Sequence, residues 1–145
     1  LSSEECVGLH VRRGDYLNHP LYKDICTYEY YYNAINLIKD KIKRPVFYIF
    51  SNDIPWCKEK FEKLFPESKV VYVDWNKGED SYCDMQLMMA CKTLVIANSS
   101  FSWWAAYLNA RNPWVISPKK WLNKIETFHY QLDDGQKFSS SIILK

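Results

Sequence analysis

The sequence has no long apolar run, no polybasic cluster and no cysteine–histidine cluster, and each absence excludes a class of protein. The apolar runs are far shorter than the roughly 20 residues that span a membrane as a helix. The net charge is only +2 and the lysines and arginines are spread out, so we expect no nucleic-acid partner. The three histidines are scattered and no CxxC pair occurs, so we expect no metal site.

The five cysteines do not form a disulfide framework, because their number is odd and their spacing is irregular. Cys6, Cys83 and Cys91 sit among apolar residues. We therefore interpret the cysteines mainly as small buried hydrophobic residues in a reducing compartment.

Glycine-rich phosphate loops are also missing, since neither GxGxxG nor GxxxxGK[ST] occurs in the sequence. A phosphate ligand would have to be held by arginine side chains and by the free N–H groups at a helix N-terminus.

What is present indicates one packed α/β domain, with 145 residues, 48% hydrophobic and 17% aromatic. Short apolar runs predict strands at 6–11, 46–50, 70–73, 93–97 and 114–116, and a less clear one at 142–144. Helical patterns predict helices at 28–42, 54–64, 81–91 and 102–109, with Thr27 and Asp53 as N-caps. Alternation of this kind is typical of a Rossmann-like parallel sheet flanked by helices.

Polar residues follow three of the predicted strands. Ligands of open α/β sheets bind beyond the carboxyl ends of the strands, where these residues should converge. The first strand leads into Arg12, Arg13 and Asp15, the second into Ser51, Asn52 and Asp53, and the fourth into Asn98, Ser99 and Ser100. The last group stands at the start of a predicted helix and so predicts an anion site.

The stretch "HVRRGDY" at residues 10–16 admits three interpretations. It can be a phosphate clamp, a charged surface turn that pairs its arginines with Asp15, or an adhesion loop built on Arg13-Gly14-Asp15. Adhesion needs an exposed loop tip, whereas this tripeptide follows a buried strand directly. We therefore set the adhesion hypothesis lowest.

Other polar and aromatic residues have plain structural interpretations beside the functional ones. His10 lies inside a strand and by default is a hydrogen-bonded core residue, although its position also allows contact with a ligand. Asp84 is by default a solvated acid in the first turn of a helix. Trp103 and Trp104 are expected in the core rather than on a carbohydrate platform. Asn98-Ser99-Ser100 matches the N-glycosylation sequon by chance.

Three stretches together resemble the α-1,2-fucosyltransferases, which use GDP-fucose. They are "HVRRGDY" (10–16), "FSNDIPWC" (50–57) and "DMQLMMACKTLVIANSSFSWWAAYL" (84–108), in the order and spacing of that family. The resemblance runs from His10 to about Trp121. The first stretch is also similar, more loosely, to the α-1,6- and protein O-fucosyltransferases.

The resemblance implies a GT-B enzyme with two Rossmann-like domains, of which residues 1–145 form the GDP-fucose-binding half. The acceptor-binding N-terminal domain of the same polypeptide is then expected to be missing, and this fragment alone to be inactive. The residues that the resemblance assigns to the catalytic role are Arg12 and Asp15. Those that it assigns to substrate binding are His10, Arg12, Arg13, Asp84, Asn98, Ser99 and Ser100.

Within that set, the resemblance implies that Arg12 holds the β-phosphate and stabilises the departing GDP. Arg13 and Asp15 would support the loop, and His10 and Asp84 would meet the guanine or its ribose. The expected reaction moves L-fucose to the 2-hydroxyl of a terminal galactoside, with inversion and without a metal or other cofactor. Asp15 and Asp53 are candidate general bases, but the residues do not decide between them, the missing half, or no base at all.

Two other functions stay open. A non-catalytic sugar-nucleotide-binding module would bind GDP without turnover, and an adhesion or carbohydrate-binding protein would ignore GDP. The expected partners are GDP-fucose and a galactose-terminated glycan. The expected location is the bacterial cytoplasm, with membrane association left open, or the Golgi lumen for a eukaryotic enzyme anchored by an upstream segment.

Overall fold

The computed structural model describes residues 5–66, 68–74, 78–121, 123 and 142–144. Short 3-10 turns lie at Gly14–Tyr16, Glu62–Leu64 and Gly78–Ser81. The strands are β1 (Cys6–Val11), β2 (Val46–Ser51), β3 (Lys69–Val73), β4 (Thr93–Val95), β5 (Trp114–Pro118) and β6 (Ile142–Leu144). The helices are α1 (Tyr28–Lys41), α2 (Ile54–Phe61), α3 (Tyr82–Met89) and α4 (Ser100–Leu108).

In the described part of the chain, six strands form one sheet in the order β3-β2-β1-β4-β5-β6. Every neighbouring pair is parallel, with Leu9 of β1 opposite Ile49 of β2 and Val95 of β4. The α/β Rossmann-like arrangement predicted from the sequence is therefore confirmed. The uncertain strand at 142–144 is present beside β5, whereas residues 124–141 lie outside the described part.

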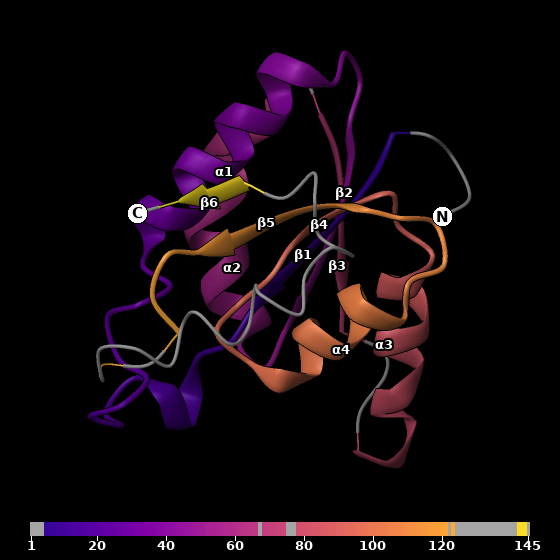
Figure 1. Ribbon diagram of the computed structural model, residues 1–145. Coiled ribbons are helices and arrows are strands. Elements are labelled where there is room, and N and C mark those ends of the chain that lie inside the picture. The colour runs from indigo at the N-terminus through magenta and orange to yellow at the C-terminus, as the bar shows by residue number, and fades with distance from the viewer. Residues whose placement is uncertain (1–4, 67, 75–77, 122, 124–141, 145) are drawn as a thin grey trace.

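Helices cover both faces of the sheet, as the uniformly apolar strands require. Figure 1 shows α1 and α2 on one side, and α3 and α4 on the other. Two separate clusters of buried side chains correspond to these layers. One joins Val7, Leu9 and Val11 of β1 to α1 and α2, and the other joins Cys6 of β1 to α3 and α4.

The helix starts follow from local chemistry, and two of them confirm predicted caps. Thr27 Oγ1 accepts a hydrogen bond from the Tyr30 amide at 3.3 Å, and Asp53 Oδ1 accepts one from the Trp56 amide at 3.2 Å. Helix α4 begins at Ser100, two residues earlier than predicted. Buried Ser102 lies inside its first turn, with its hydroxyl oxygen 3.2 Å from the Ala97 amide nitrogen.

The prediction that both tryptophans of α4 lie in the core is wrong for Trp104, which is 46% exposed. Small side chains form the buried face of this helix, namely Ser102, Ala105 and Ala106. They fill the i, i+3, i+4 positions that face the sheet, so Trp104 is turned outward. Its ring packs edge-on against Trp103 with centroids 4.9 Å apart.

All five cysteines are free thiols, and they are less uniform than expected. Cys6, Cys57 and Cys91 are buried, while Cys26 and Cys83 are partly exposed. The expectation of an apolar environment is met for Cys6 and Cys91, whose sulfur atoms are 3.0 Å apart in the layer under α3 and α4. Cys83 does not meet it, because it lies in the first turn of α3 with part of its surface in solvent.

Candidate functional site

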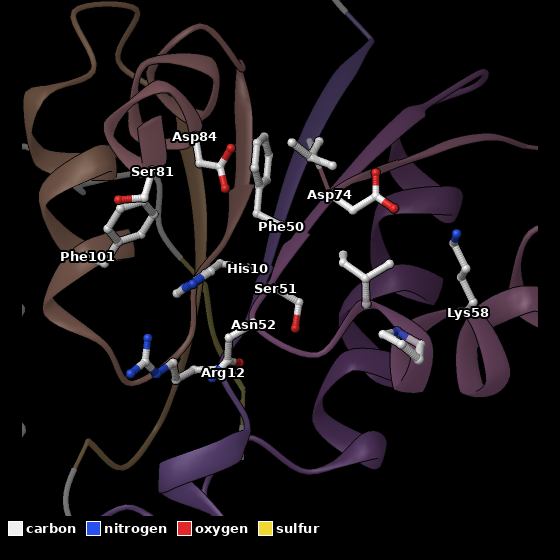
Figure 2. A pocket seen from close by; sticks show the side chains of 13 residues that line it. His10, Arg12, Phe50, Ser51, Asn52, Lys58, Asp74, Ser81, Asp84 and Phe101 are labelled. Carbon is white, nitrogen blue, oxygen red and sulfur yellow. The ribbon is translucent and has the colours of Figure 1, made fainter. Parts of the chain in front are cut away.

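A cavity of about 650 Å³ opens at the carboxyl ends of β1, β2 and β3, between these strands and helices α2, α3 and α4. Figure 2 shows the side chains around it. They are His10, Arg12, Phe50, Ser51, Asn52, Ile54, Pro55, Lys58, Val73, Asp74, Ser81, Asp84 and Phe101. This is the edge at which the sequence predicted a ligand site.

The alternation of side chains along β1 decides which residues reach the cavity. Successive side chains of a strand point to opposite faces, so His10 and the following Arg12 share the face under α3 and α4. Both line the cavity. Val11 between them belongs to the core under α1, and Arg13 follows it to that side.

His10 is buried, with 5% of its surface exposed, and its ring lies 5.4 Å from that of Phe101. Burial, helped by the charge of Arg12, lowers the pKa of His10 to about 3, so the imidazole is neutral at ordinary pH. Its Nδ1 atom has no hydrogen-bond partner among the described residues. The default expectation of a satisfied core histidine is therefore wrong, and the structure leaves one ring nitrogen available beside the cavity.

Arg12 and Lys58 are the two cationic side chains that line the cavity, and Arg12 is the one beside His10. Its Nη2 atom lies 3.1 Å from each carboxylate oxygen of Asp15, and its guanidinium lies 5.2 Å from the ring centre of Tyr16. The buried Nε–H group has no partner among the described residues. Because Asp15 is 64% exposed, this ion pair is weak, and Arg12 retains donors for an anionic ligand.

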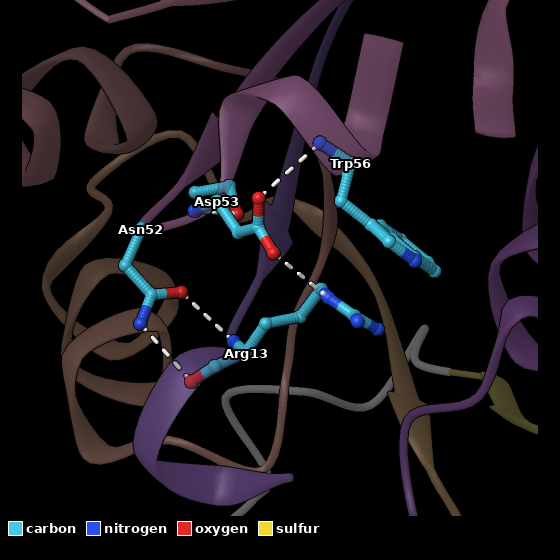
Figure 3. A network of polar contacts seen from close by, with 5 residues as sticks. Arg13, Asn52, Asp53 and Trp56 are labelled. Carbon is cyan, nitrogen blue, oxygen red and sulfur yellow. Dashed lines mark hydrogen bonds and ion pairs between the residues drawn. The ribbon is translucent and has the colours of Figure 1, made fainter. Parts of the chain in front are cut away.

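Arg13 is not among the residues that line the cavity. Figure 3 shows its contacts with Asn52, Asp53 and Trp56. Its Nε atom donates to Asp53 Oδ2 at 3.2 Å, and its guanidinium stacks 3.9 Å above the ring of Trp56. Its side chain is only 22% exposed. An adhesion loop would need this arginine at a free loop tip, so the geometry disfavours the Arg13-Gly14-Asp15 adhesion hypothesis.

The acidic residue of α3 reaches the cavity, whereas the polar residues at the start of α4 have other partners. Asp84 is half-buried in the first turn of α3 and lines the cavity. Asn98 is buried, and its amide nitrogen lies 3.2 Å from the Trp121 carbonyl oxygen and 3.4 Å from that of Tyr22. Burial of this nitrogen confirms that the sequon there is a chance match.

The two serines stand at the mouth of α4 but not among the cavity-lining residues. Ser99 is buried as the N-cap residue of α4, without a side-chain capping bond. Ser100 is exposed as the first helical residue. The structure therefore brings together His10, Arg12 and Asp84, and it keeps Arg13, Asp15, Asn98, Ser99 and Ser100 outside the cavity lining.

Several cavity-lining residues were not singled out by the sequence, and most are apolar. Phe50 ends a predicted strand and Phe101 lies in the first turn of α4, and neither was predicted to face a ligand. The remainder are Ile54, Pro55, Lys58, Val73, Asp74 and Ser81. Asp74 and Ser81 could have been found, because Asp74 directly follows β3 and Ser81 directly precedes α3. The others carry no local signal.

The described ranges lack two further kinds of feature, a metal site and a membrane span. No group of three or more His, Cys, Asp or Glu side chains is arranged there to hold a metal ion. Over the same residues, no helix combines the length and the apolarity needed to cross a membrane.

The fold and the cavity define the class: a Rossmann-like domain with a cavity at the carboxyl ends of its strands that one arginine lines. The model of glycosyl transferase family 11 matches residues 2–135. An α-1,2-colitosyltransferase of Escherichia coli is 38% identical over 125 residues, covering 83% of this chain and 42% of that protein. The chain belongs to glycosyl transferase family 11.

Other relatives agree with this assignment. The O-antigen biosynthesis glycosyltransferase WbnK of Escherichia coli is 38% identical over 79% of this chain and 38% of its own length. The human galactoside α-(1,2)-fucosyltransferase 1 is 30% identical over 70% of this chain and 28% of its own length. The chain thus spans about two fifths of the bacterial relatives and less than a third of the human one.

Proposed function

We propose that this chain is the GDP-fucose-binding half of a two-domain GT-B enzyme that transfers L-fucose to the 2-hydroxyl of a terminal galactoside. The relatives named for α-1,2 transfer support the linkage, and the human relative is named for a galactoside acceptor. In this proposal the reaction inverts the anomeric carbon and needs no metal. The acceptor glycan binds mainly to a second domain of the same polypeptide.

The observation that carries the proposal is the pair of buried, unpartnered polar atoms at the cavity. His10 Nδ1 and Arg12 Nε lie on the same face of β1, and neither has a hydrogen-bond partner among the described residues. Leaving such groups unsatisfied costs about 1–3 kcal/mol each, so a ligand that bonds to them gains that energy back. A nucleoside diphosphate offers an anionic oxygen to Arg12 and polar edges to His10.

The two side chains divide the work by charge. The lowered pKa of His10 keeps it neutral, so it can orient a base or ribose but cannot neutralise a phosphate. Arg12 carries the charge that binds the β-phosphate and stabilises GDP as the glycosidic bond breaks. The half-buried Asp84 carboxylate can accept from N1–H and the 2-amino group of guanine, a donor pair that adenine and pyrimidines do not present in this form.

The chemical step is an attack of the acceptor hydroxyl on the anomeric carbon of fucose. The bond to the β-phosphate oxygen breaks as the new bond forms, and the bond electrons leave with GDP. In this proposal that growing negative charge is stabilised by Arg12 and by the N-terminal end of α4, whose residue Phe101 also lines the cavity. Stabilising the leaving group is therefore the main contribution of this half of the enzyme.

Neither of the two candidate bases, Asp15 and Asp53, is well placed to act as a general base. Both carboxylate oxygens of Asp53 are engaged, one by Arg13 and one by the Trp56 amide. Asp15 is exposed and pairs with Arg12, so we assign it to orienting that guanidinium. The base, if the reaction uses one, belongs to the acceptor-binding half.

The donor sugar has a second candidate, because one bacterial relative is named for colitosyl transfer. Colitose lacks the 3-hydroxyl of fucose, so a pocket that hydrogen-bonds this hydroxyl would prefer fucose strongly. Comparing GDP-fucose with GDP-colitose in the full-length enzyme distinguishes the two. A protein that binds GDP but turns over neither donor is the non-catalytic module.

Calorimetric titration of GDP into this chain, with a chelator present, tests the binding half of the proposal. We expect saturable binding to GDP, weaker binding to UDP and ADP, and loss of binding in Arg12→Ala at unchanged folding. If the folded chain and the full-length enzyme both fail to bind GDP, the proposal is wrong. If binding requires a divalent metal, its metal-independent form is wrong.

A further inference from the structure

The side chain of Asn52 forms two hydrogen bonds with the main chain of Arg13. Its Oδ1 atom accepts from the Arg13 amide at 2.8 Å, and its Nδ2 atom donates to the Arg13 carbonyl at 3.0 Å (Figure 3). The carboxamide therefore pairs with the main chain of Arg13 as a neighbouring strand would. Arg13 directly follows Arg12 in the loop after β1.

The position of this clamp coincides with the end of the regular sheet. The parallel register of β1 and β2 ends with Val11 opposite Ser51, and Asn52 is the next residue of its strand. The two side-chain hydrogen bonds of Asn52 therefore connect the two segments just beyond the last main-chain pair of β1 and β2. The Arg13 carbonyl also accepts from the Tyr16 amide at 3.4 Å, a bond within the following turn, whereas the two bonds from Asn52 tie the Arg13 main chain to the end of β2.

Gly14 shows that the loop is shaped around this contact. Its φ is +64°, a conformation that strains any residue with a side chain. A Cβ atom added there would stand 3.0 Å from Asn52 Nδ2, closer than ordinary contact. The carboxamide of Asn52 can thus approach the Arg13 carbonyl closely because residue 14 has no side chain.

The side chain of Arg13 is fixed as firmly as its main chain. Asp53 and Trp56 hold its guanidinium on the far side of β1 from the cavity. Arg12, in contrast, has an exposed aspartate as its ion-pair partner and a tyrosine ring at 5.2 Å. The direction of Arg12 therefore depends on the main chain that leads into Arg13.

We propose that Asn52 is a positioning residue that determines which of the two adjacent arginines enters the cavity. Its clamp fixes the peptide planes on both sides of Arg13, which keeps Arg12 directed at the ligand and Arg13 directed at its anchor. A rotation of this segment by one residue would exchange the two arginines between the faces of the sheet. The consequence for donor binding rests on the function proposed above.

A double-mutant cycle between Asn52→Ala and Arg12→Ala tests the consequence for binding. We expect Asn52→Ala to weaken GDP binding about ten-fold in the wild-type background, a size typical of coupled residues in contact. In the Arg12→Ala background it should change GDP affinity little, because it acts through Arg12. An equal loss in both backgrounds would overturn the proposal, since it would show a direct contact of Asn52 with the nucleotide.

A matched control and a second variant separate positioning from folding. Asn109 forms a similar clamp, accepting from the Arg111 amide at 2.9 Å and donating to the Cys91 carbonyl at 2.7 Å. Asn109→Ala should lower stability and leave GDP affinity unchanged. Gly14→Ala disturbs the Asn52 clamp from the other side and should weaken GDP binding as Asn52→Ala does. Unchanged affinity in Gly14→Ala would contradict the proposal.

A readout that needs no ligand keeps this test separate from that of the proposed function. NMR relaxation of the arginine Nε–H groups should show Arg12 becoming mobile in Asn52→Ala, with Asn109→Ala as control. A rigid Arg12 in the folded Asn52→Ala variant overturns the positioning role. Absence of GDP binding in the wild type would instead count against the proposed function alone.

Discussion

On one face of the sheet, β1 presents Val7, Leu9 and Val11 to α1 and α2, where large aromatic side chains close the core. On the other face it presents Cys6, Gly8 and His10 to α3 and α4, and Arg12 continues that row. On the first face, even the hydroxyl groups of the buried tyrosines are hydrogen-bonded. Tyr30 donates to the Ile96 carbonyl at 2.7 Å, and Tyr31 to the His10 carbonyl at 3.0 Å.

The second face changes character along the strand. Near its amino end, Gly8 lets Leu94 and Cys91 approach closely, so this part is as tight as the first face. At its carboxyl end the packing gives way to a cavity with two unpartnered polar atoms. A single strand therefore stabilises the fold on one side and presents a ligand site on the other.

The comparison predicts that damage to the first face affects stability alone. Ile38 is fully buried on α1, and Ile38→Ala should lower the free energy of unfolding by about 2–5 kcal/mol. Urea unfolding measures this loss, and GDP affinity of the folded fraction should be unchanged. Asn33→Ala, an exposed change on the same helix, is the control. A matching loss of GDP affinity would show that the two faces are not independent.

His10 makes the second face sensitive to pH. Its pKa is about 3 in the folded state, against 6.5 for an unperturbed histidine. Between these values the unfolded chain binds a proton that the folded chain does not, so stability falls as pH is lowered. The contribution of His10 is about 1.4 kcal/mol for each pH unit below 6.5.

Urea unfolding of the wild type and His10→Gln from pH 7 to pH 4.5 checks this slope. The variant should lose less stability on acidification, whereas His19→Gln, an exposed control, should follow the wild type. Parallel curves for all three proteins would mean that His10 is not buried in its neutral form.

The tight end of the second face is tested by Gly8→Ala. The added Cβ would stand 2.8 Å from Leu94 Cδ2 and 3.2 Å from Cys91 Sγ, so packing must shift. We expect a loss of about 1–3 kcal/mol by thermal or urea unfolding. Leu94→Val shortens the obstructing side chain, so it should lower the free energy of unfolding less in the Gly8→Ala background than in the wild type. Equal losses from Leu94→Val in both backgrounds would contradict this packing.

The smallest effect is expected at the rim, in the ion pair between Arg12 and Asp15. Asp15 is 64% exposed, so Asp15→Asn should change stability by less than about 1 kcal/mol. Any effect should shrink in high salt, because exposed charges are screened. Unfolding curves at low and high salt give this measurement. A large loss that salt does not reduce would mean that the pair is structural.

The sequence was sufficient for the fold class and for most strand positions because each buried parallel strand is an unbroken apolar run between helical patterns. It also placed Arg12 and Arg13 at the edge of the sheet, since both directly follow a strand. The site roles of His10 and Asp84 came from the family resemblance, and both residues line the cavity with Arg12. Without the resemblance, the residues alone could not separate Arg12 from Arg13. Their different directions depend on Asn52, nearly 40 positions away, and on the register of β1 against β2.

The apolar lining shows the other limit of sequence reasoning. Phe50 is 1% exposed and belongs to the core cluster under α3 and α4, against which Phe101 packs, yet both residues also line the cavity. Trp104 fails in the opposite sense, because small residues on the same helix occupy the buried face. The size of a side chain does not by itself determine whether its face of the helix is buried.

Comparing the GDP affinities of Arg12→Ala and Arg13→Ala tests most directly the claim that the second face of β1 binds the nucleotide. Loss of the charged partner for phosphate should weaken GDP binding by about a hundred-fold in Arg12→Ala, with little change in unfolding. Arg13→Ala should lower stability and keep GDP affinity within about five-fold of wild type, since its guanidinium lies at Asp53 and Trp56. The reverse pattern would contradict the account and place the phosphate on the other side of the strand.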